Sequence, residues 1–372
     1  MIIAHLTSVH FRYDPRVFLK ECAGLARAGH SVFLVVADGK GDETRNGVRI
    51  VDAGPRHGSR LLRMTGTVSR VYGKAREIPA DAYHIHDPEL LPAAMLLRLG
   101  GKLVVYDVHE DYSTAVLEKG YIPMPLRRAL SWGIRRLEPL AASPFPVVIA
   151  EKYYAERFPE GVPILNYPLR EELVPGESAV PELPPFPRLL YTGNITEARG
   201  AANHVSLLKA CPGFHLFMVG RCSPDLAARL RAQAGEDAPR LHIVGEGQSV
   251  PFGTILGYYA AGGWTAGLAL FPPSVHYERK ELTKFFEYMS FGIPVLASAF
   301  PAWKDLVEGN GCGLCVDPAD RAAAAAAVAE MAGGGAAAKA MGGRGRAAVE
   351  ERFNWDREEA KLLALYGSLF RK

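Results

Sequence analysis

Short apolar runs alternate with amphipathic segments along most of the chain. The run 2–7 predicts a strand, residues 15–28 carry apolar side chains at helical spacing, and 31–36 predicts a second strand. A strand, a helix and a strand in this order form a βαβ unit with parallel strands. The same rhythm continues through predicted strands at 82–86, 102–108 and 146–150 and a predicted helix at 89–99. We therefore expect an α/β domain with a parallel sheet.

A proline-rich stretch interrupts this rhythm, which then restarts. The interruption contains Pro175, Pro181, Pro184, Pro185 and Pro187, a composition typical of a linker. Beyond it we expect strands at 188–192, 215–219 and 241–244 and a helix at 201–210. Two α/β halves joined by a linker predict two doubly wound domains with a cleft between them. We expect a first domain at 1–168, a linker at 169–187, a second domain at 188–352 and a terminal segment at 353–372.

The last part of the chain is rich in alanine and glycine. Residues 321–348 predict plain helices with breaks at 333–335 and 342–343, where glycines cluster. A last helix is expected at 355–370. We expect this terminal helix to dock back on the first domain.

The segment 276–298 carries the clearest functional pattern. A predicted strand at 267–271 ends in two prolines, and a polar loop then leads into a helix that Gly292 ends. In open α/β sheets, ligands bind where such loops leave the carboxyl ends of strands, and a helix N-terminus favours an anion such as a diphosphate. Lys284 and Glu287, one turn apart, are suited to a phosphate and a ribose. The alternative is an ordinary amphipathic helix with a solvated Lys–Glu pair.

Two further loops leave the carboxyl ends of predicted strands. His109, Glu110 and Asp111 follow the strand at 102–108, and the polar loop 193–200 follows the strand at 188–192. His109 is suited to hydrogen bonding or acid–base chemistry, and Arg199 to a developing phosphate charge. The alternatives are a structural histidine and a surface arginine.

Metal and dinucleotide chemistry are not indicated. His84 and His86 lie on one side of a predicted strand, a spacing that suits a metal, but no third ligand stands out. No Asp-x-Asp pair is present to hold a divalent cation with a nucleotide. The loop 8–14 contains no glycine, which argues against a dinucleotide fingerprint. We expect no metal and no cofactor.

Composition narrows the class of protein further. A net charge of +3 over 372 residues is too small to indicate nucleic acid binding. No run approaches the roughly 18 apolar residues of a membrane span, and the first residues lack the features of a signal peptide. Five cysteines, an odd number, suit reduced thiols. We therefore expect a cytoplasmic protein.

Basic and apolar residues are interleaved in two stretches, 56–76 and 127–136. The first carries six basic residues and no acidic one, and the second carries four arginines beside Leu130, Trp132 and Ile134. Basic amphipathic helices are typical of peripheral binding to an anionic membrane, here the inner face. The alternative is a pair of solvated helix faces over a core.

Four segments together resemble family 4 glycosyltransferases of the GT-B type, over essentially the whole chain. They are SVHFRYDPRVFLKECAGLARAGHSV, HIHDPELLPAAMLLRLGGKLVVYDVHEDY, LYTGNITEARG and LTKFFEYMSFGIPVLASAFPAWKDLVEGNGCGLCVDP. The resemblance implies two Rossmann-like domains facing across a cleft. It also implies sugar transfer from a UDP- or GDP-sugar to a saccharide or lipid-linked acceptor, with retention and without a metal, in polysaccharide or glycolipid biosynthesis.

The resemblance also assigns roles to residues. His109 matches the histidine that lines the donor sugar, Glu287 the glutamate on the nucleotide ribose, and Lys284 a lysine common in one subgroup. Arg199 lies near the family's basic residue on the diphosphate, so we expect His109, Arg199 and Lys284 to be catalytic. Donor binding is expected to include Gly193, Asn194 and Thr283. The acceptor-side candidates, which an inverting enzyme would need as bases, are Asp14, Asp87, Glu110 and Asp111.

Some positions depart from the family pattern. The first motif glutamate is replaced by Arg279, the usual Gly-Gly of the first loop is absent, and Asn194 stands where a second basic residue is usual. Two alternatives to a transferase therefore stay open. One is a non-catalytic partner that binds a nucleotide sugar or another transferase, and the other is a sugar-nucleotide epimerase on the same fold.

Overall fold

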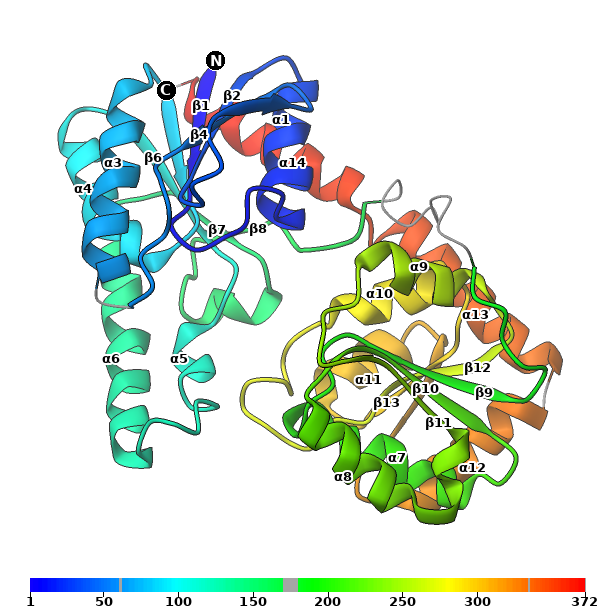
Figure 1. The fold of residues 1–372 in the computed structure, drawn as a ribbon. Helices are drawn as coiled ribbons and strands as arrows, with labels where there is room; N and C mark the ends of the chain where they lie inside the picture. Colours follow the sequence, from blue (N-terminus) through cyan, green and yellow to red (C-terminus); the bar gives the residue numbers. More distant parts are fainter. Residues whose placement is uncertain (60–61, 170–179, 334, 372) are drawn as a thin grey trace. The chain divides into compact units, whose positions relative to one another are not determined.

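The structure is a computed structural model that describes residues 1–59, 62–169, 180–333 and 335–371. These residues form two compact units, which we describe separately (Figure 1). The first unit comprises Met1–Asn166 and the residues from Trp355 onward, and the second comprises Tyr167–Asn354. Most of the predicted linker, residues 170–179, lies outside the described residues.

An eight-stranded sheet forms the centre of the first unit, in the order β3-β4-β2-β1-β5-β6-β7-β8. Its paired strands are parallel except β3, which runs antiparallel to β4. The strands are β1 (Ile2–Leu6), β2 (Ser31–Val36), β3 (Glu43–Arg45), β4 (Val48–Asp52), β5 (Ala82–Ile85), β6 (Leu103–Val108), β7 (Val147–Ile149) and β8 (Val162–Pro163). The helices are η1 (Pro15–Cys22), α1 (Ala23–Arg27), η2 (Arg63–Thr67), α3 (Val68–Glu77), η3 (Pro88–Leu90), α4 (Leu91–Leu99), α5 (Tyr112–Ala115), α6 (Met124–Ala142), η4 (Lys152–Glu156) and α14 (Trp355–Leu369).

The helix predicted at 15–28 begins as a π-helix, η1, and continues as α1. Asp14 caps it by accepting hydrogen bonds from the backbone N–H groups of Arg16 and Val17. Single π-turns are rare and occur mostly at functional sites. Here the wide turns bury three charged side chains, those of Arg16, Lys20 and Glu21.

The second unit contains a fully parallel sheet in the order β11-β10-β9-β12-β13-β14. Its strands are β9 (Arg188–Thr192), β10 (His215–Cys222), β11 (Leu241–Glu246), β12 (Trp264–Ala269), β13 (Val295–Ser298) and β14 (Gly313–Val316). Its helices are η6 (Glu197–Arg199), α7 (Ala201–Ala210), α8 (Pro224–Ala234), η7 (Gly235–Arg240), α9 (Phe252–Ala260), α10 (Thr283–Ser290), α11 (Pro301–Val307), α12 (Arg321–Gly333) and α13 (Gly335–Glu351). The prediction of two α/β units with largely parallel sheets is confirmed.

The predicted helix break at 342–343 is wrong, because α13 continues through both glycines. Glycine is needed at position 342 because α13 packs against the end of α10. A Cβ atom at position 342 would lie 2.1 Å from the carbonyl oxygen of Gly292. Gly342 therefore permits a close approach between backbones and does not end the helix.

The terminal helix α14 belongs to the first unit and lies beside α1 and η1 (Figure 1). Its Tyr366 hydroxyl is 3.0 Å from Nδ1 of His84, a buried contact with β5. The carboxylate of Glu358 accepts a hydrogen bond of 2.8 Å from the backbone N–H of Leu165. The last residues of the chain thus complete the core of its first part. Among the described helices, none is both long enough and apolar enough to cross a membrane.

Candidate active site

Two cations of the second unit converge on the turn that follows β9. The guanidinium of Arg199 and the ammonium of Lys284 each lie 3.7 Å from the point where a Cβ atom of Gly193 would stand. Arg199 comes from η6 and Lys284 from the first turn of α10. Among the described residues, neither forms an ion-pair contact with a carboxylate, although the charge of Glu287 acts on Lys284. An anion at this turn would be paired with both cations.

Lys284 is held in place by neutral groups. Its Nζ donates a hydrogen bond of 2.6 Å to the carbonyl oxygen of Thr192 and lies 3.8 Å from the centre of the Tyr191 ring. Burial, followed by the nearby charge of Arg199, lowers the pKa of Lys284 well below its usual value. A bound anion would favour the charged form of this lysine, so the site is prepared for negative charge.

Glu287 lies one helical turn after Lys284 on α10. Its Oε2 accepts a hydrogen bond of 2.6 Å from the hydroxyl of Tyr259, and that hydroxyl is 2.7 Å from Oγ1 of Thr192. This connection links the carboxylate to the end of β9. Thr283 is exposed as the first residue of α10.

The structure adds three tyrosines that the sequence did not single out. Tyr259 orients Glu287, Tyr191 lies under Lys284 and donates to the carbonyl oxygen of Asn194, and the Tyr277 hydroxyl accepts a bond of 3.3 Å from Arg199. They come from a helix, a strand and a loop far apart in the chain. No local pattern connects them.

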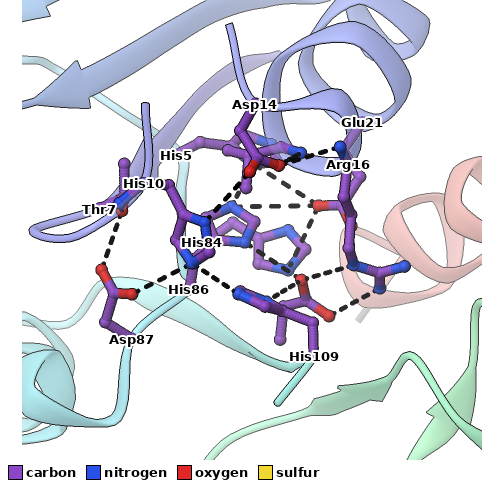
Figure 2. Close-up of polar contacts among 12 residues, drawn as sticks. His5, Thr7, His10, Asp14, Arg16, Glu21, His84, His86, Asp87 and His109 are labelled. Atoms are coloured by element: carbon purple, nitrogen blue, oxygen red, sulfur yellow. Dashed lines mark hydrogen bonds and ion pairs between the residues drawn. The ribbon is translucent and has the colours of Figure 1, made fainter. Parts of the chain in front are cut away.

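His109 of the first unit follows β6 and contacts two other side chains (Figure 2). Its Nδ1 is 3.0 Å from Oδ2 of Asp107, and its Nε2 is 2.7 Å from Nε2 of His10. Asp107 is buried and bound by the guanidinium of Arg16 through contacts of 2.7 and 3.0 Å. Burial alone would raise the pKa of Asp107, but the charge of Arg16 outweighs it and holds that pKa well below its usual value. His109 is thus held by an ionised carboxylate.

His10 lies between two carboxylates, as Figure 2 shows. Its Nδ1 is 3.2 Å from Oδ2 of Asp14, and its Nε2 is 3.4 Å from Oδ1 of Asp87. Burial would lower the pKa of His10, but hydrogen bonds to these two carboxylates outweigh it and raise the pKa to about 10. His10 is therefore protonated at neutral pH. No sequence pattern singles out His10.

The four acceptor-side candidates differ in how they are engaged. Asp14 caps η1, and Oδ2 of Asp87 accepts three hydrogen bonds from Thr7 and Ser8. Asp111 caps α5 and forms an ion pair of 3.0 Å with Arg157. These contacts favour the ionised carboxylates as structural acceptors. Glu110, in contrast, is exposed.

A buried group of four possible metal ligands lies beneath His109. Ligand atoms of Glu21, His84, His86 and Asp107 lie within 4.8 Å of one another. Both ring nitrogens of His86 already have partners, Asp107 at 3.1 Å and His5 at 2.9 Å. Arg16 also contacts both carboxylates. A guanidinium beside both carboxylates disfavours a divalent cation, so these residues fit a polar core better than a metal centre.

The sequence of the first unit matches a known family. Residues 16–150 match the family described as glycosyl transferase 4-like domain. A comparison with curated protein sequences finds no match.

Solved structures of glycosyltransferases have a similar fold. Sucrose-phosphate synthase from Thermosynechococcus elongatus is 21% identical with a TM-score of 0.75, over 100% of this chain and 99% of its own. HepE from Anabaena in complex with UDP and glucose is 14% identical with a TM-score of 0.71, over 99% and 100%. WaaG, a glycosyltransferase involved in lipopolysaccharide biosynthesis, is 14% identical with a TM-score of 0.66, over 97% and 98%.

The family match covers most of the first unit, and the similar structures identify the fold of the whole chain. Both agree with the two parallel-sheet α/β units described above. The chain therefore contains a region similar to the glycosyl transferase 4-like domain at residues 16–150, and its fold is that of solved GT-B glycosyltransferases.

Proposed function

We propose that the second unit binds a nucleotide-diphosphate sugar and that the enzyme transfers the sugar with retention and without a metal. The observation that carries this proposal is the convergence of Arg199 and Lys284 on the turn at Gly193. The two cations neutralise the diphosphate, together with the N–H groups that open α10 near Thr283. Asn194 lies at the same turn. Glu287, one turn along α10, accepts from the ribose hydroxyls.

A UDP-sugar is the donor we favour, because HepE, of similar fold, was solved with UDP and glucose. His109 lines the donor sugar in our proposal. Asp14, Asp87 and Asp111 are already engaged as acceptors, so none is a free base for the incoming hydroxyl. In a retaining reaction the departing phosphate oxygen takes that proton, and the acceptor oxygen bonds to the anomeric carbon as the phosphate bond breaks.

Binding of UDP, GDP, ADP, TDP and CMP to the full chain tests the donor site. A ligand at about one hundred times its Kd stabilises the protein by about 2.7 kcal/mol, which a thermal-shift assay detects. We expect one uridine or guanosine diphosphate to raise the Tm. Glu287→Ala should weaken its binding about tenfold or more, because a hydrogen bond to a charged group is worth about 1.5–3 kcal/mol.

Glu236→Ala is a matched control, because Glu236 lies in η7, away from the Gly193 turn. It should leave the Kd unchanged. Absence of binding by every nucleotide, or equal binding by the Glu287 variant, would contradict the assigned donor site. Sugar transfer or hydrolysis of the bound UDP- or GDP-sugar then tests turnover and excludes the non-catalytic alternative.

We also propose that the acceptor is lipid-linked and that α6 rests on the cytoplasmic face of an anionic membrane. Leu126, Leu130, Leu137 and Leu140 form one exposed stripe on α6, and Trp132 is 67% exposed. The same helix exposes Arg128, Arg135 and Arg136. Its acidic residue, Glu138, is buried and paired with Arg157 at 2.6 Å. A second copy of this helix would present the same positive charge, so an anionic lipid surface fits the helix better.

The first basic stretch, 56–76, supports membrane binding less directly. Several of its charges are engaged within the first unit: Arg56 contacts the carbonyl oxygen of Val9, Arg63 pairs with Glu89, and Lys74 pairs with Glu77. The exposed arginines of α6 therefore carry the proposal. Five unpaired cysteines fit the reducing conditions at a cytoplasmic face.

Vesicle co-sedimentation tests the membrane surface. We expect binding to anionic phospholipid vesicles that salt weakens, and little binding to zwitterionic ones. Replacing Arg128, Arg135 and Arg136 by glutamine should abolish this binding. Replacing Arg321, Arg344 and Arg357 of the other helices by glutamine is the control and should not. Binding that is indifferent to lipid charge, or equal in both triple variants, would contradict this assignment.

A further inference from the structure

The side chains of His10 and His109 form a pair whose proton content can be counted from its contacts. Three hydrogen bonds run in series, from Asp107 to His109 (3.0 Å), from His109 to His10 (2.7 Å) and from His10 to Asp14 (3.2 Å). The two ends of this series are carboxylates, which accept only. Each Nδ1 atom must therefore carry a hydrogen, and the contact between the two Nε2 atoms needs one more.

Three N–H groups on two imidazole rings amount to one positive charge shared by the pair. The position of that charge follows from the surroundings. His10 contacts two carboxylates, Asp14 at 3.2 Å and Asp87 at 3.4 Å. His109 contacts one, Asp107, and that carboxylate is already bound by Arg16. The charge is therefore more stable on His10 than on His109.

We propose that His10 is a positioning residue that holds this proton and keeps His109 neutral, with hydrogen on Nδ1 and the lone pair on Nε2. The proposal rests on the function assigned above to His109 as the residue that lines the donor sugar. The ring centres of His10 and His109 are 4.5 Å apart. A second proton on the pair would bring two positive charges together at this distance.

The other ionisable side chains near the pair do not favour a second proton on it. The His86 ring lies 5.8 Å from that of His109, but burial lowers the pKa of His86 to about 3, so it is neutral. Arg56 contacts the carbonyl oxygen of Val9, next to His10. Arg16 lies on the far side of Asp107. Both arginines add positive charge nearby and disfavour a second proton on the pair.

A neutral His109 matters for the proposed chemistry. Positive charge builds up on the sugar ring as its bond to the phosphate breaks. An imidazolium beside the ring would oppose this charge, whereas a neutral imidazole does not. His10 then acts on the reaction through His109, without contact of its own to the substrate.

Nitrogen NMR of the full chain with ¹⁵N-labelled histidine tests the proposal without any substrate. Near neutral pH we expect His109 to be neutral with hydrogen on Nδ1, and His10 to be an imidazolium. In His10→Asn, Nε2 of His109 loses its partner at 2.7 Å, so the nitrogen signals of His109 should shift from those of the wild type. His30→Asn is the matched control and should leave the signals of His10 and His109 unchanged. His30 directly precedes β2, at the edge of the sheet opposite the carboxyl ends of the strands.

The pH profile of sugar transfer provides a second readout. The acid limb of kcat/KM should move to higher pH in His10→Asn, because the positive charge held by His10 no longer disfavours a further proton at this site. A merely structural role for His10 would lower kcat/KM or Tm at every pH without moving this limb. If His10→Asn does not fold, Asp14→Asn keeps the cap of η1 and removes one carboxylate from His10.

Asp14→Asn should bring the loss of the His10 proton to lower pH in the NMR titration. A wild-type protein with imidazolium at His109 near neutral pH would overturn the proposal, and so would an unchanged His109 signal in His10→Asn. If the enzyme fails to use any nucleotide sugar, the NMR result still decides the proton assignment. The two proposals therefore fail separately.

Discussion

Arg16 is the buried charge on which the polar core of the first unit depends. Its side chain is 4% exposed and forms ion pairs with Asp107 at 2.7 Å and Glu21 at 3.1 Å. It also donates a hydrogen bond of 3.0 Å to the carbonyl oxygen of Ile164. Arg16→Met keeps the length of the side chain and removes the charge. Asp107, Glu21 and the carbonyl oxygen of Ile164 then lose the guanidinium, and Asp107 keeps only its contacts with His86 and His109.

We expect Arg16→Met to lower the free energy of unfolding by about 3–5 kcal/mol, the usual cost of leaving buried charges uncompensated. In units of about 150–250 residues, each kcal/mol lowers the Tm by about 2–4 °C, so the Tm should fall by about 6–20 °C. Arg16 would no longer hold Asp107, so the distance between Asp107 and His109 would no longer be fixed. Activity should therefore fall as well.

The loss in the free energy of unfolding should depend on pH. In the wild type the pKa of Asp107 is lowered, so its stabilising contribution is present above its unfolded pKa of about 3.9 and disappears as the pH falls below it. Without Arg16, the burial of Asp107 is no longer outweighed, and this carboxylate takes up a proton more readily, whereas burial already raises the pKa of Glu21 in the wild type. The difference between variant and wild type should therefore be largest near neutral pH and smaller in acid.

Urea unfolding at several pH values measures this difference. Arg27→Met is the matched control, because Arg27 is 52% exposed and its ion pair with Glu359 lies at the surface. It should cost no more than about 1 kcal/mol. A loss below about 1 kcal/mol for Arg16→Met, or a loss that does not change with pH, would refute the reasoning.

Further substitutions and the pH dependence of stability probe other parts of the structure. Gly342→Ala should destabilise the second unit in urea unfolding, because its Cβ atom would lie 2.1 Å from the carbonyl oxygen of Gly292, whereas Gly343→Ala meets nothing within 4 Å and should stabilise α13 by about 0.5–1 kcal/mol. Tyr366→Phe should cost about 1–3 kcal/mol by removing the partner of buried His84, and an unchanged Tm would show that this contact contributes nothing. Burial would raise the pKa of Asp14, but hydrogen bonds from His10 and from the backbone N–H of Val17 lower it to about 2, so its contribution should be present above about pH 4 and lost towards pH 2. His10 has a raised pKa of about 10, so its contribution should be full below about pH 6.5 and lost as the pH rises through 10; His10→Asn should remove that alkaline loss.

Local pattern predicted the regular elements well. The strands at 31–36 and 188–192 and the helix at 201–210 have the predicted bounds, because each combines a clear periodicity with an end signal such as glycine or proline. The break at 342–343 failed for the opposite reason. Glycine there serves a contact between helices far apart in the chain, and no local pattern distinguishes that use from a helix end.

The sequence alone determined that this protein consists of two α/β halves. It placed Arg199 in a loop after one strand, and Lys284 and Glu287 on the helix that follows another strand and its loop. Only the tertiary structure decided what those side chains contact. It brought Arg199 and Lys284 together at Gly193, and it paired His109 with His10, 99 residues earlier in the chain. The physical reason is that periodicity reports which face of an element is buried, whereas hydrogen bonds and charge pairs depend on distances between elements that only the packed sheet defines.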